Sequence, residues 1–295
     1  MLIGLVVGSF INVVAHRVPM EMSVVSPRSR CPGCETQIRA WDNIPVLSWF
    51  LLRGRCRDCS RPISARYPAV EALCGLLFLL VFFQVSGLLA SSALAFGWAS
   101  FHGVLFVSLL LAVTLIDLDH FIIPDMLSLP GCLVGLAFAF VAPEAIGVSW
   151  QESAVGAVSG SGFLLLIAVG YAALRGREGM GMGDVKLMTT IGAFLGVYAI
   201  PFVIFSAAFQ GSVLAILWLV FSGKPDPGEP ASVGLPEPEG DGESGALTEA
   251  SDPDAVDESY EGVAAMQVPF GPFLALGSLE WYLFSDYLSA LFPLY

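Results

Sequence analysis

Eight long apolar segments restrict what this chain can fold into more than any other feature of its sequence. A helix that crosses a bilayer needs about 20 consecutive, mostly apolar residues. Of the 295 residues, 56% are hydrophobic and only 13% are charged, whereas about 25% of an average soluble domain is charged. The sequence therefore predicts an all-α polytopic membrane protein with about eight transmembrane helices. The apolar segments cover roughly residues 1–16, 68–92, 97–116, 126–143, 153–174, 184–198, 199–221 and 267–293.

The segments also define the expected domains. Residues 1–16 could instead be a signal peptide, but no small-residue cleavage site follows them, so we expect a retained transmembrane helix. The domains expected after this first helix are a small cytoplasmic domain at 17–67, a transmembrane core with helices 2–7 at 68–221, an acidic loop at 222–265, and transmembrane helix 8 with the C-terminus at 266–295.

Arginine residues between the first two segments indicate the orientation in the membrane. Nine of the thirteen Lys and Arg residues lie within 17–67, and positive residues in short loops stay in the cytoplasm. If the later segments cross alternately, the turns at 117–125 and 175–184 and the acidic loop also face the cytoplasm. The nine residues are Arg17, Arg28, Arg30, Arg39, Arg53, Arg55, Arg57, Arg61 and Arg66.

The segment 223–262 carries most of the negative charge. It holds twelve acidic residues against one base, Lys224, so removing it would change the net charge from −13 to −2. It is rich in Pro, Gly and Ser and nearly lacks aromatic residues, so it cannot bury enough apolar area to fold. We expect a disordered, solvated loop; docking of a partner is the alternative.

Four of the six cysteines form two Cys-x-x-Cys pairs in the cytoplasmic domain, at Cys31 with Cys34 and at Cys56 with Cys59. Two such pairs are typical of a four-thiolate, structural zinc site of the zinc-ribbon type. A pair of disulfides would need an oxidising compartment, and a redox pair would normally occur beside a βαβ pattern, so both alternatives fit less well. A domain of about 50 residues is also too small to be stable by core burial alone.

Carboxylates at the ends of apolar segments are the candidate catalytic groups, since charges in a membrane are costly and usually functional. Asp117 ends the apolar run that precedes it, and Asp184 follows a turn with glycines at 179, 181 and 183. Capping of the next helix is the structural alternative for Asp184. Asp119 cannot share a helix face with Asp117 and is expected to be a solvated edge residue. Asp125 is expected to cap the helix after it.

Two carboxyl groups held close together cannot both ionise easily, so one keeps its proton. The ionised group can then take a proton from water while the protonated group polarises a peptide carbonyl. Glycines beside the pair would let an extended substrate backbone approach. The pattern therefore predicts aspartic-protease chemistry at the cytoplasmic edge of the membrane, by Asp117 and Asp184 as a pair.

These residues resemble the bacterial type IV prepilin peptidases (leader peptidase/N-methyltransferases), a branch of the GxGD intramembrane aspartyl proteases. The resemblance extends over nearly the whole chain and includes the four-cysteine spacing. The matching motifs are Gly8-Ser-Phe-Ile-Asn-Val-Val-Ala-His-Arg17-Val-Pro19, Trp41-Asp-Asn-Ile-Pro-Val-Leu-Ser48, Ser64-Ala-Arg-Tyr-Pro-Ala-Val-Glu71, Ile116-Asp117-Leu-Asp-His-Phe-Ile-Ile-Pro124-Asp125, Gly181-Met-Gly183-Asp184-Val-Lys186-Leu and Val268-Pro-Phe-Gly-Pro-Phe-Leu274.

The resemblance implies that Asp117 and Asp184 cut a prepilin or pseudopilin after a glycine on the cytoplasmic side. It also implies methylation of the new N-terminal residue with S-adenosylmethionine as donor, structural Zn2+ on the cysteines, and a bacterial inner-membrane location. Expected partners are these substrates and membrane lipid, with no nucleic acid. A peptidase without methyltransferase activity and, further off, a proton-coupled transporter are the alternatives.

The methyl-donor site cannot be placed by a motif, since no glycine-rich nucleotide fingerprint is visible. Glu71, at the start of the second apolar segment, is a candidate polar group for it. The alternative for Glu71 is an ion pair with Arg66.

Overall fold

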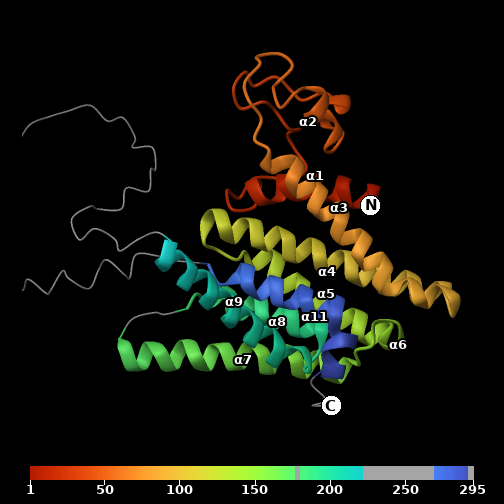
Figure 1. Ribbon diagram of the computed structural model, residues 1–295, viewed down its shortest axis with the longest axis vertical. Coiled ribbons are helices and arrows are strands. Elements are labelled where there is room, and N and C mark those ends of the chain that lie inside the picture. Colours follow the sequence, from red (N-terminus) through yellow and green to blue (C-terminus); the bar gives the residue numbers. More distant parts are fainter. Residues whose placement is uncertain (177–179, 222–268, 292–295) are drawn as a thin grey trace, which may run out of the picture. The chain divides into compact units, whose positions relative to one another are not determined.

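The computed structural model describes residues 1–176, 180–221 and 269–291, and within them the chain forms helices and loops without a β-strand (Figure 1). The predicted acidic loop at 222–265 lies outside these residues. Two 3-10 helices, Ala40–Asn43 and Ser86–Ala90, accompany the α-helices. The α-helices are α1 (Leu2–Arg17), α2 (Leu47–Leu51), α3 (Arg66–Val85), α4 (Ala93–His120), α5 (Asp125–Val141), α6 (Pro143–Ile146), α7 (Trp150–Arg175), α8 (Met182–Leu195), α9 (Ala199–Phe221) and α11 (Gly271–Leu291).

Every predicted apolar segment overlaps one of these helices, so the all-helical architecture is confirmed for the described residues. Only some helices have the length and composition to cross a bilayer, so the expected number of about eight crossings stays a prediction. α1 and α5 are apolar but shorter. The four long apolar helices are Arg66–Ala90, Ala93–His120, Trp150–Arg175 and Ala199–Trp218.

The chain divides into two compact units, Met1–Gly211 with Pro269–Tyr295, and Ser212–Val268. Of the second unit, the structure describes residues 212–221, the end of α9, where Trp218 and Phe221 are exposed.

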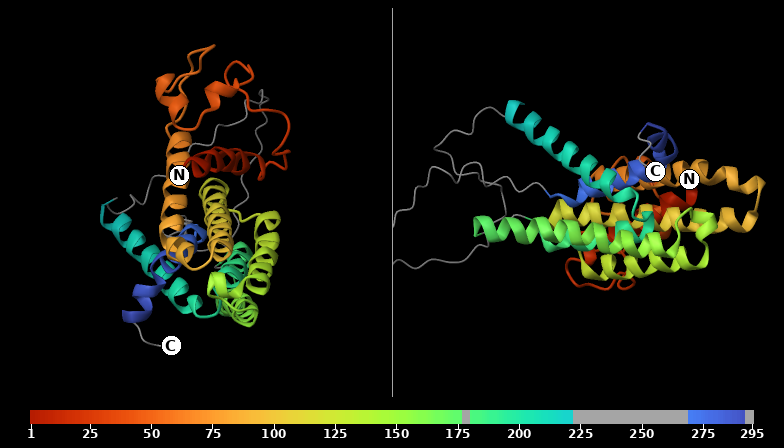
Figure 2. Two further views of the ribbon diagram at one scale, coloured as in Figure 1. Left: turned by 90° about the vertical axis from the view of Figure 1, so that its right-hand side faces the viewer. Right: turned by 90° about the horizontal axis from the view of Figure 1, so that it is seen from below.

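Helix α8 forms the centre of the main core, although it is only 14 residues long. Leu187, Met188 and Ile191 are fully buried, and Phe194 stacks on Phe106 of α4 with ring centroids 4.9 Å apart. Helices α4, α7, α9 and α11 supply the other buried residues of this cluster, and Figures 1 and 2 show α8 among them. A helix that is buried on all sides has apolar residues around its whole circumference, whereas a surface helix has them along one stripe.

Small residues bring α8 close to its neighbours. Gly156 of α7 faces Gly192 of α8 so closely that a side chain on either would collide with the backbone of the other. On the α5 side, the Thr190 hydroxyl donates a hydrogen bond of 2.6 Å to the Ser128 carbonyl. Such close, small-residue packing is the usual way in which helices associate in membranes. It fixes the position of the residues at the start of α8.

A second core cluster joins α1, α3 and α4, with Ile11, Phe78 and Ile116 among its buried residues. Gly4 and Gly8 of α1 lie against the backbone of α3, where an added Cβ would come within 2.8 Å of backbone atoms. Helix α4 contributes to both clusters, and it lies between α1 and α3 on one side and the helices around α8 on the other (Figure 2). The end of α4 is therefore held from two directions.

Candidate functional site

Asp117 lies in the last turn of α4, which continues to His120, beyond the predicted end at residue 116. Its side chain is buried, with the residue only 5% exposed. Phe121 ends the helix in the left-handed conformation, φ 55°, and its N–H bonds to the carbonyl of Asp117. Helix geometry and the buried neighbour Ile116 thus hold this carboxyl group inside the protein rather than at its edge.

Asp184 lies in the first turn of α8 and is 8% exposed. The N-cap of α8 is the extended residue Gly181, and no side chain caps the helix. The alternative interpretation of Asp184 as a helix cap is therefore wrong. Because α8 is packed closely on both sides, the backbone at Asp184 has a fixed position. Gly179 of the glycine motif lies outside the described residues.

The fold brings these two acids together although they are 67 positions apart in the sequence. Their carboxyl groups are close enough for the two charges to interact. Gly183, the residue before Asp184, lies against Ile123, since an added Cβ there would be 3.0 Å from the Ile123 side chain. Gly271, the first residue of α11, faces both Ile123 and the Asp117 carboxyl group. Three helices thus meet at the acid pair.

Gly271 leaves no room for a side chain beside Asp117, because a Cβ there would overlap Oδ2 of the carboxyl group. The backbone N–H of Gly271 points toward this carboxyl group. Oδ2 of Asp117 is nevertheless buried without a hydrogen-bond partner among the residues that the structure describes. An unpaired buried carboxyl oxygen is costly and is typical of a group that reacts. The sequence motif at 268–274 contained Gly271 but did not indicate its role.

The two other acids at this end of the helices form ion pairs. Asp119 accepts two hydrogen bonds, 2.6 and 2.7 Å long, from the Arg66 guanidinium. Asp125 is paired with Lys186 at 2.6 Å, and α5 has no side-chain cap. The expected cap role of Asp125 is therefore wrong, whereas Asp119 is an exposed edge residue as expected. Both pairs tie helices together close to the buried acids.

The four cysteines between α1 and α3 come together. Their sulfur atoms all lie within 4.8 Å of one another, and the Cys31 and Cys59 sulfurs are 3.7 Å apart. Sulfurs around a tetrahedral zinc ion, each with a bond of about 2.3 Å, are separated by about 3.8 Å. A disulfide would need about 2 Å, and all four thiols are free. The arrangement fits a four-thiolate metal site.

Both cysteine pairs sit in loops of the same backbone form. In each loop the first cysteine N–H bonds to a carbonyl five residues ahead, from Cys31 to Thr36 and from Cys56 to Arg61. Each loop also has a residue with positive φ four positions after its first cysteine, Glu35 in one and Ser60 in the other. Two matching loops present the two thiol pairs to one point.

The local electrostatics of the cysteines favour a bound cation. N–H groups of Gly33 and Cys34 lower the pKa of the Cys31 thiol to about 6, so it is a thiolate at neutral pH. The Arg61 N–H also favours the Cys59 thiolate, but burial and the neighbouring cysteines outweigh it and raise the pKa of Cys59 to about 12. Four thiolates can form together only when a metal ion offsets their repulsion.

Glu71 is buried in the second turn of α3 and accepts a hydrogen bond of 2.7 Å from the Val46 N–H. Val46 has φ 61°, a region that β-branched residues rarely adopt. The Arg66 side chain pairs with Asp119, so the alternative interpretation of Glu71 as its ion-pair partner is wrong. The Glu71 carboxylate instead joins α3 to the backbone just before α2.

Glu280 is a polar residue that the sequence reasoning missed. It lies midway along α11, and its carboxylate accepts hydrogen bonds from the Ser206 hydroxyl at 2.5 Å and the Gln210 amide at 2.9 Å, both on α9. The sequence signal for this contact was the four-residue spacing of Ser206 and Gln210, which places both donors on one face of α9. A satisfied carboxylate between two apolar helices links them.

Two family models match the chain. The bacterial peptidase A24 N-terminal domain matches residues 2–85, and the type IV leader peptidase family matches residues 104–216. A prepilin leader peptidase/N-methyltransferase of Myxococcus xanthus is 37% identical over 321 residues, which cover 99% of this chain and 91% of that protein. Proteins of the same name from Neisseria gonorrhoeae and Burkholderia pseudomallei are 37% and 38% identical over 75% and 73% of this chain, and 82% and 74% of their own lengths. No solved structure matches the chain.

Proposed function

Because this chain belongs to the type IV leader peptidase family, we propose that it is an aspartic endopeptidase that removes the leader of type IV prepilins or pseudopilins. Cleavage follows a glycine on the cytoplasmic side, and the enzyme then methylates the new N-terminal residue. The observation that carries the peptidase proposal is the pairing of two buried carboxyl groups, Asp117 and Asp184, from separate helices.

The catalytic roles belong to the pair rather than to one residue. Two interacting carboxyl groups in a buried site share a proton. The ionised one accepts a proton from a water molecule as the water attacks the scissile carbonyl, and the protonated one donates a hydrogen bond to that carbonyl oxygen. The free Oδ2 of Asp117 is available for such a bond. Neither carboxyl group needs a metal ion for these steps.

The surroundings of the pair suit an extended peptide. Gly181 precedes α8 in an extended conformation, and an added Cβ there would meet no atom closer than 3.9 Å. A peptide backbone can therefore approach Asp184 from this side. Both acids lie at the ends of their helices that we assign to the cytoplasm of the inner membrane. The apolar stem of a prepilin would remain in the bilayer while its leader reaches the pair.

The cysteine domain is proposed to hold one structural Zn2+ ion through Cys31, Cys34, Cys56 and Cys59. The sulfur separations and the matching loops support this assignment. The ion would supply folding energy to residues 17–67, where Cys31 is the only buried apolar side chain between positions 19 and 65. Such a closed four-thiolate site leaves no open position for catalysis.

For the methyl transfer, the donor is proposed to be S-adenosylmethionine, which supplies an activated methyl group. Glu71 stays the candidate polar group for this step, because it is a buried carboxylate at the boundary between the cysteine domain and α3. No other residue is assigned to the donor. The remaining domain boundaries are proposed as the sequence predicted them.

Cleavage of a purified prepilin by the purified enzyme tests the acid pair. We expect Asp117→Asn and Asp184→Asn each to abolish cleavage, since each removes a carboxyl group from the pair. Asp119→Asn is the matched control: it makes the same change at an exposed acid in the same turn and should retain most of the activity. Normal cleavage by either of the first two variants would refute the proposed pair.

Mass spectrometry of the product in the same assay tests methylation. With S-adenosylmethionine present, the mature product should gain the mass of one methyl group, and without it the product should be cleaved but unmodified. A cleaved product that never gains this mass would show a peptidase without methyltransferase activity.

A further inference from the structure

Helix α2 lies beside the membrane helix α3 rather than out in the cytoplasm. The N–H of Val46, the residue just before α2, donates its hydrogen bond to Glu71. Glu71 is five residues beyond Arg66, which places it about 7.5 Å further along the helix axis. The exposed Arg66–Asp119 ion pair marks the polar level at the start of α3. Helix α2 therefore begins below this level, on the side of the hydrocarbon, and Figure 1 shows α2 next to the start of α3.

At this depth α2 presents a row of uncovered apolar side chains. Leu47, Phe50 and Leu51 are 52%, 65% and 72% exposed. The other side of the helix is occupied, since Ser48 is buried and the Trp49 indole N–H bonds to the Ile63 carbonyl at 3.0 Å. A short helix that is apolar outward and polar inward, at the level of the bilayer interface, is suited to contact with lipid.

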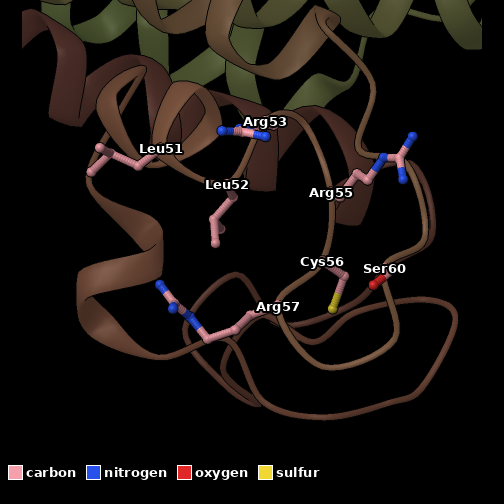
Figure 3. A pocket seen from close by; sticks show the side chains of 7 residues that line it. All are labelled: Leu51, Leu52, Arg53, Arg55, Cys56, Arg57 and Ser60. Carbon is pink, nitrogen blue, oxygen red and sulfur yellow. The ribbon is translucent and has the colours of Figure 1, made fainter.

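Arginines follow the apolar row directly. Arg53 and Arg55 are exposed and have no carboxylate partner among the residues with described positions, whereas Arg57 is paired with Asp42 at 2.6 Å. The three arginines line an open cavity of about 570 Å³ between α2 and the second cysteine loop (Figure 3). Leu51 and Leu52 also line this cavity (Figure 3).

We propose that α2 and the arginines after it form an interfacial anchor for anionic phospholipids of the cytoplasmic leaflet. Leu47, Phe50 and Leu51 enter the boundary between headgroups and acyl chains. The Arg53 and Arg55 guanidinium groups bind lipid phosphates, which arginine recognises through paired hydrogen bonds. Residues 17–67 carry nine arginines against four acidic residues, so the whole domain is attracted to a negative leaflet. The anchor goes beyond the peptidase proposal and rests only on the proposed orientation.

Amide hydrogen exchange of the full chain in nanodiscs tests this anchor. Residues 46–57 should exchange more slowly in nanodiscs of phosphatidylcholine with phosphatidylglycerol than in phosphatidylcholine alone. The double variant Arg53→Gln/Arg55→Gln should lose most of this difference, since each arginine near an anionic surface contributes about a fivefold preference for the bound state. The double variant Phe50→Ser/Leu51→Ser should exchange faster in both kinds of nanodisc.

The matched control is Arg28→Gln/Arg30→Gln, which removes two exposed arginines from the same domain but far along the chain from α2. In this variant, residues 46–57 should still exchange more slowly when phosphatidylglycerol is present. Exchange of the cysteine loops reports whether each variant is folded. The anchor would be overturned if residues 46–57 exchanged equally fast in both kinds of nanodisc. It would also be overturned if the control variant lost the phosphatidylglycerol effect as fully as Arg53→Gln/Arg55→Gln. Two further results would also contradict the anchor. One is the same protection in phosphatidylcholine nanodiscs after addition of inorganic phosphate, and the other is the same protection through self-association at higher protein concentration.

Discussion

Gly271 shows how a single residue without a side chain can determine the geometry of the candidate site. It begins α11, and a Cβ added to it would meet the Asp117 carboxyl group and the Ile123 side chain. The space is too small for any Cβ, since that atom would overlap Oδ2 of Asp117. Gly271 therefore acts as a positioning residue for the carboxyl group, through its backbone.

Gly271→Ala is expected to lower kcat for prepilin cleavage by about 10- to 100-fold, because displacement of a catalytic group by about 1 Å has effects of this size. KM should change little, since the substituted position faces the carboxyl group rather than a bound peptide. Steady-state kinetics on the purified variant measure both constants.

Gly211→Ala is the control for this substitution. A Cβ at Gly211 would make ordinary contact with the Phe273 ring, at 3.7 Å, so its kcat should equal that of the parent. A parental kcat in Gly271→Ala would contradict the positioning role. A loss of kcat in both variants would mean that the effect is general to the packing of α11.

Among the elements, α8 is unusual because it is short and buried, and its position depends on glycine contacts with α7. Gly192 and Gly156 let the two backbones touch, and the Ser153 hydroxyl donates to the Ala193 carbonyl at 2.6 Å. Since Asp184 is in the first turn of α8, this contact also sets the depth of the second acid.

We expect Gly192→Ala to destabilise the protein by about 1–3 kcal/mol, the usual range for overpacking a close contact. Thermal unfolding in detergent measures the change. Gly162→Ala is the matched control in α7, where an added Cβ meets nothing within 4 Å. It should be neutral or stabilising by up to about 1 kcal/mol, because alanine favours helices. Equal stability of both variants would show that the glycine contact is not needed.

On the scale of the whole molecule, the helical core and the cysteine domain are stabilised by different means. The core clusters are built from helices, whereas the residues from 19 to 65 bury a single apolar side chain, that of Cys31. Such a domain needs a bound metal ion or contact with another surface to stay folded.

Removal of metal by a chelator should therefore increase amide exchange over residues 28–63 and leave exchange in α4 and α8 unchanged. Hydrogen-exchange mass spectrometry of the full chain separates the two regions, and metal analysis should show loss of one zinc ion per chain. Cys31→Ser should reproduce the effect, while Cys132→Ser in α5 should keep the metal. Unchanged exchange after complete metal removal would contradict a structural role for zinc.

Much of the fold could be predicted from local patterns. Apolar segments of bilayer length predicted each long helix, because backbone groups in lipid must bond within their own segment. The spacing of Cys31, Cys34, Cys56 and Cys59 predicted their cluster, since each pair lies in one short loop. The candidate acids were found for a similar reason, because a carboxylate in an apolar run is conspicuous.

Contacts between distant segments could not be predicted in this way. Asp125 resembled a helix cap, but its partner is Lys186, which lies 61 positions away. The position of Glu71 near Arg66 suggests an ion pair, but its carboxylate accepts a hydrogen bond from the Val46 N–H. In each case the local alternative was sterically possible, and the packing of helices decided against it.

The sequence by itself thus determined that the chain forms membrane helices, that a thiol cluster lies between the first two, and that Asp117 and Asp184 are its exceptional acids. Only the tertiary structure decided that both acids are buried, that Gly271 closes on Asp117, and that α2 lies beside α3. The physical reason is the distance along the chain over which each property is determined. The length of an apolar segment, the spacing of cysteines and the presence of a carboxylate are properties of one segment. The position of a side chain depends on which distant helices pack together.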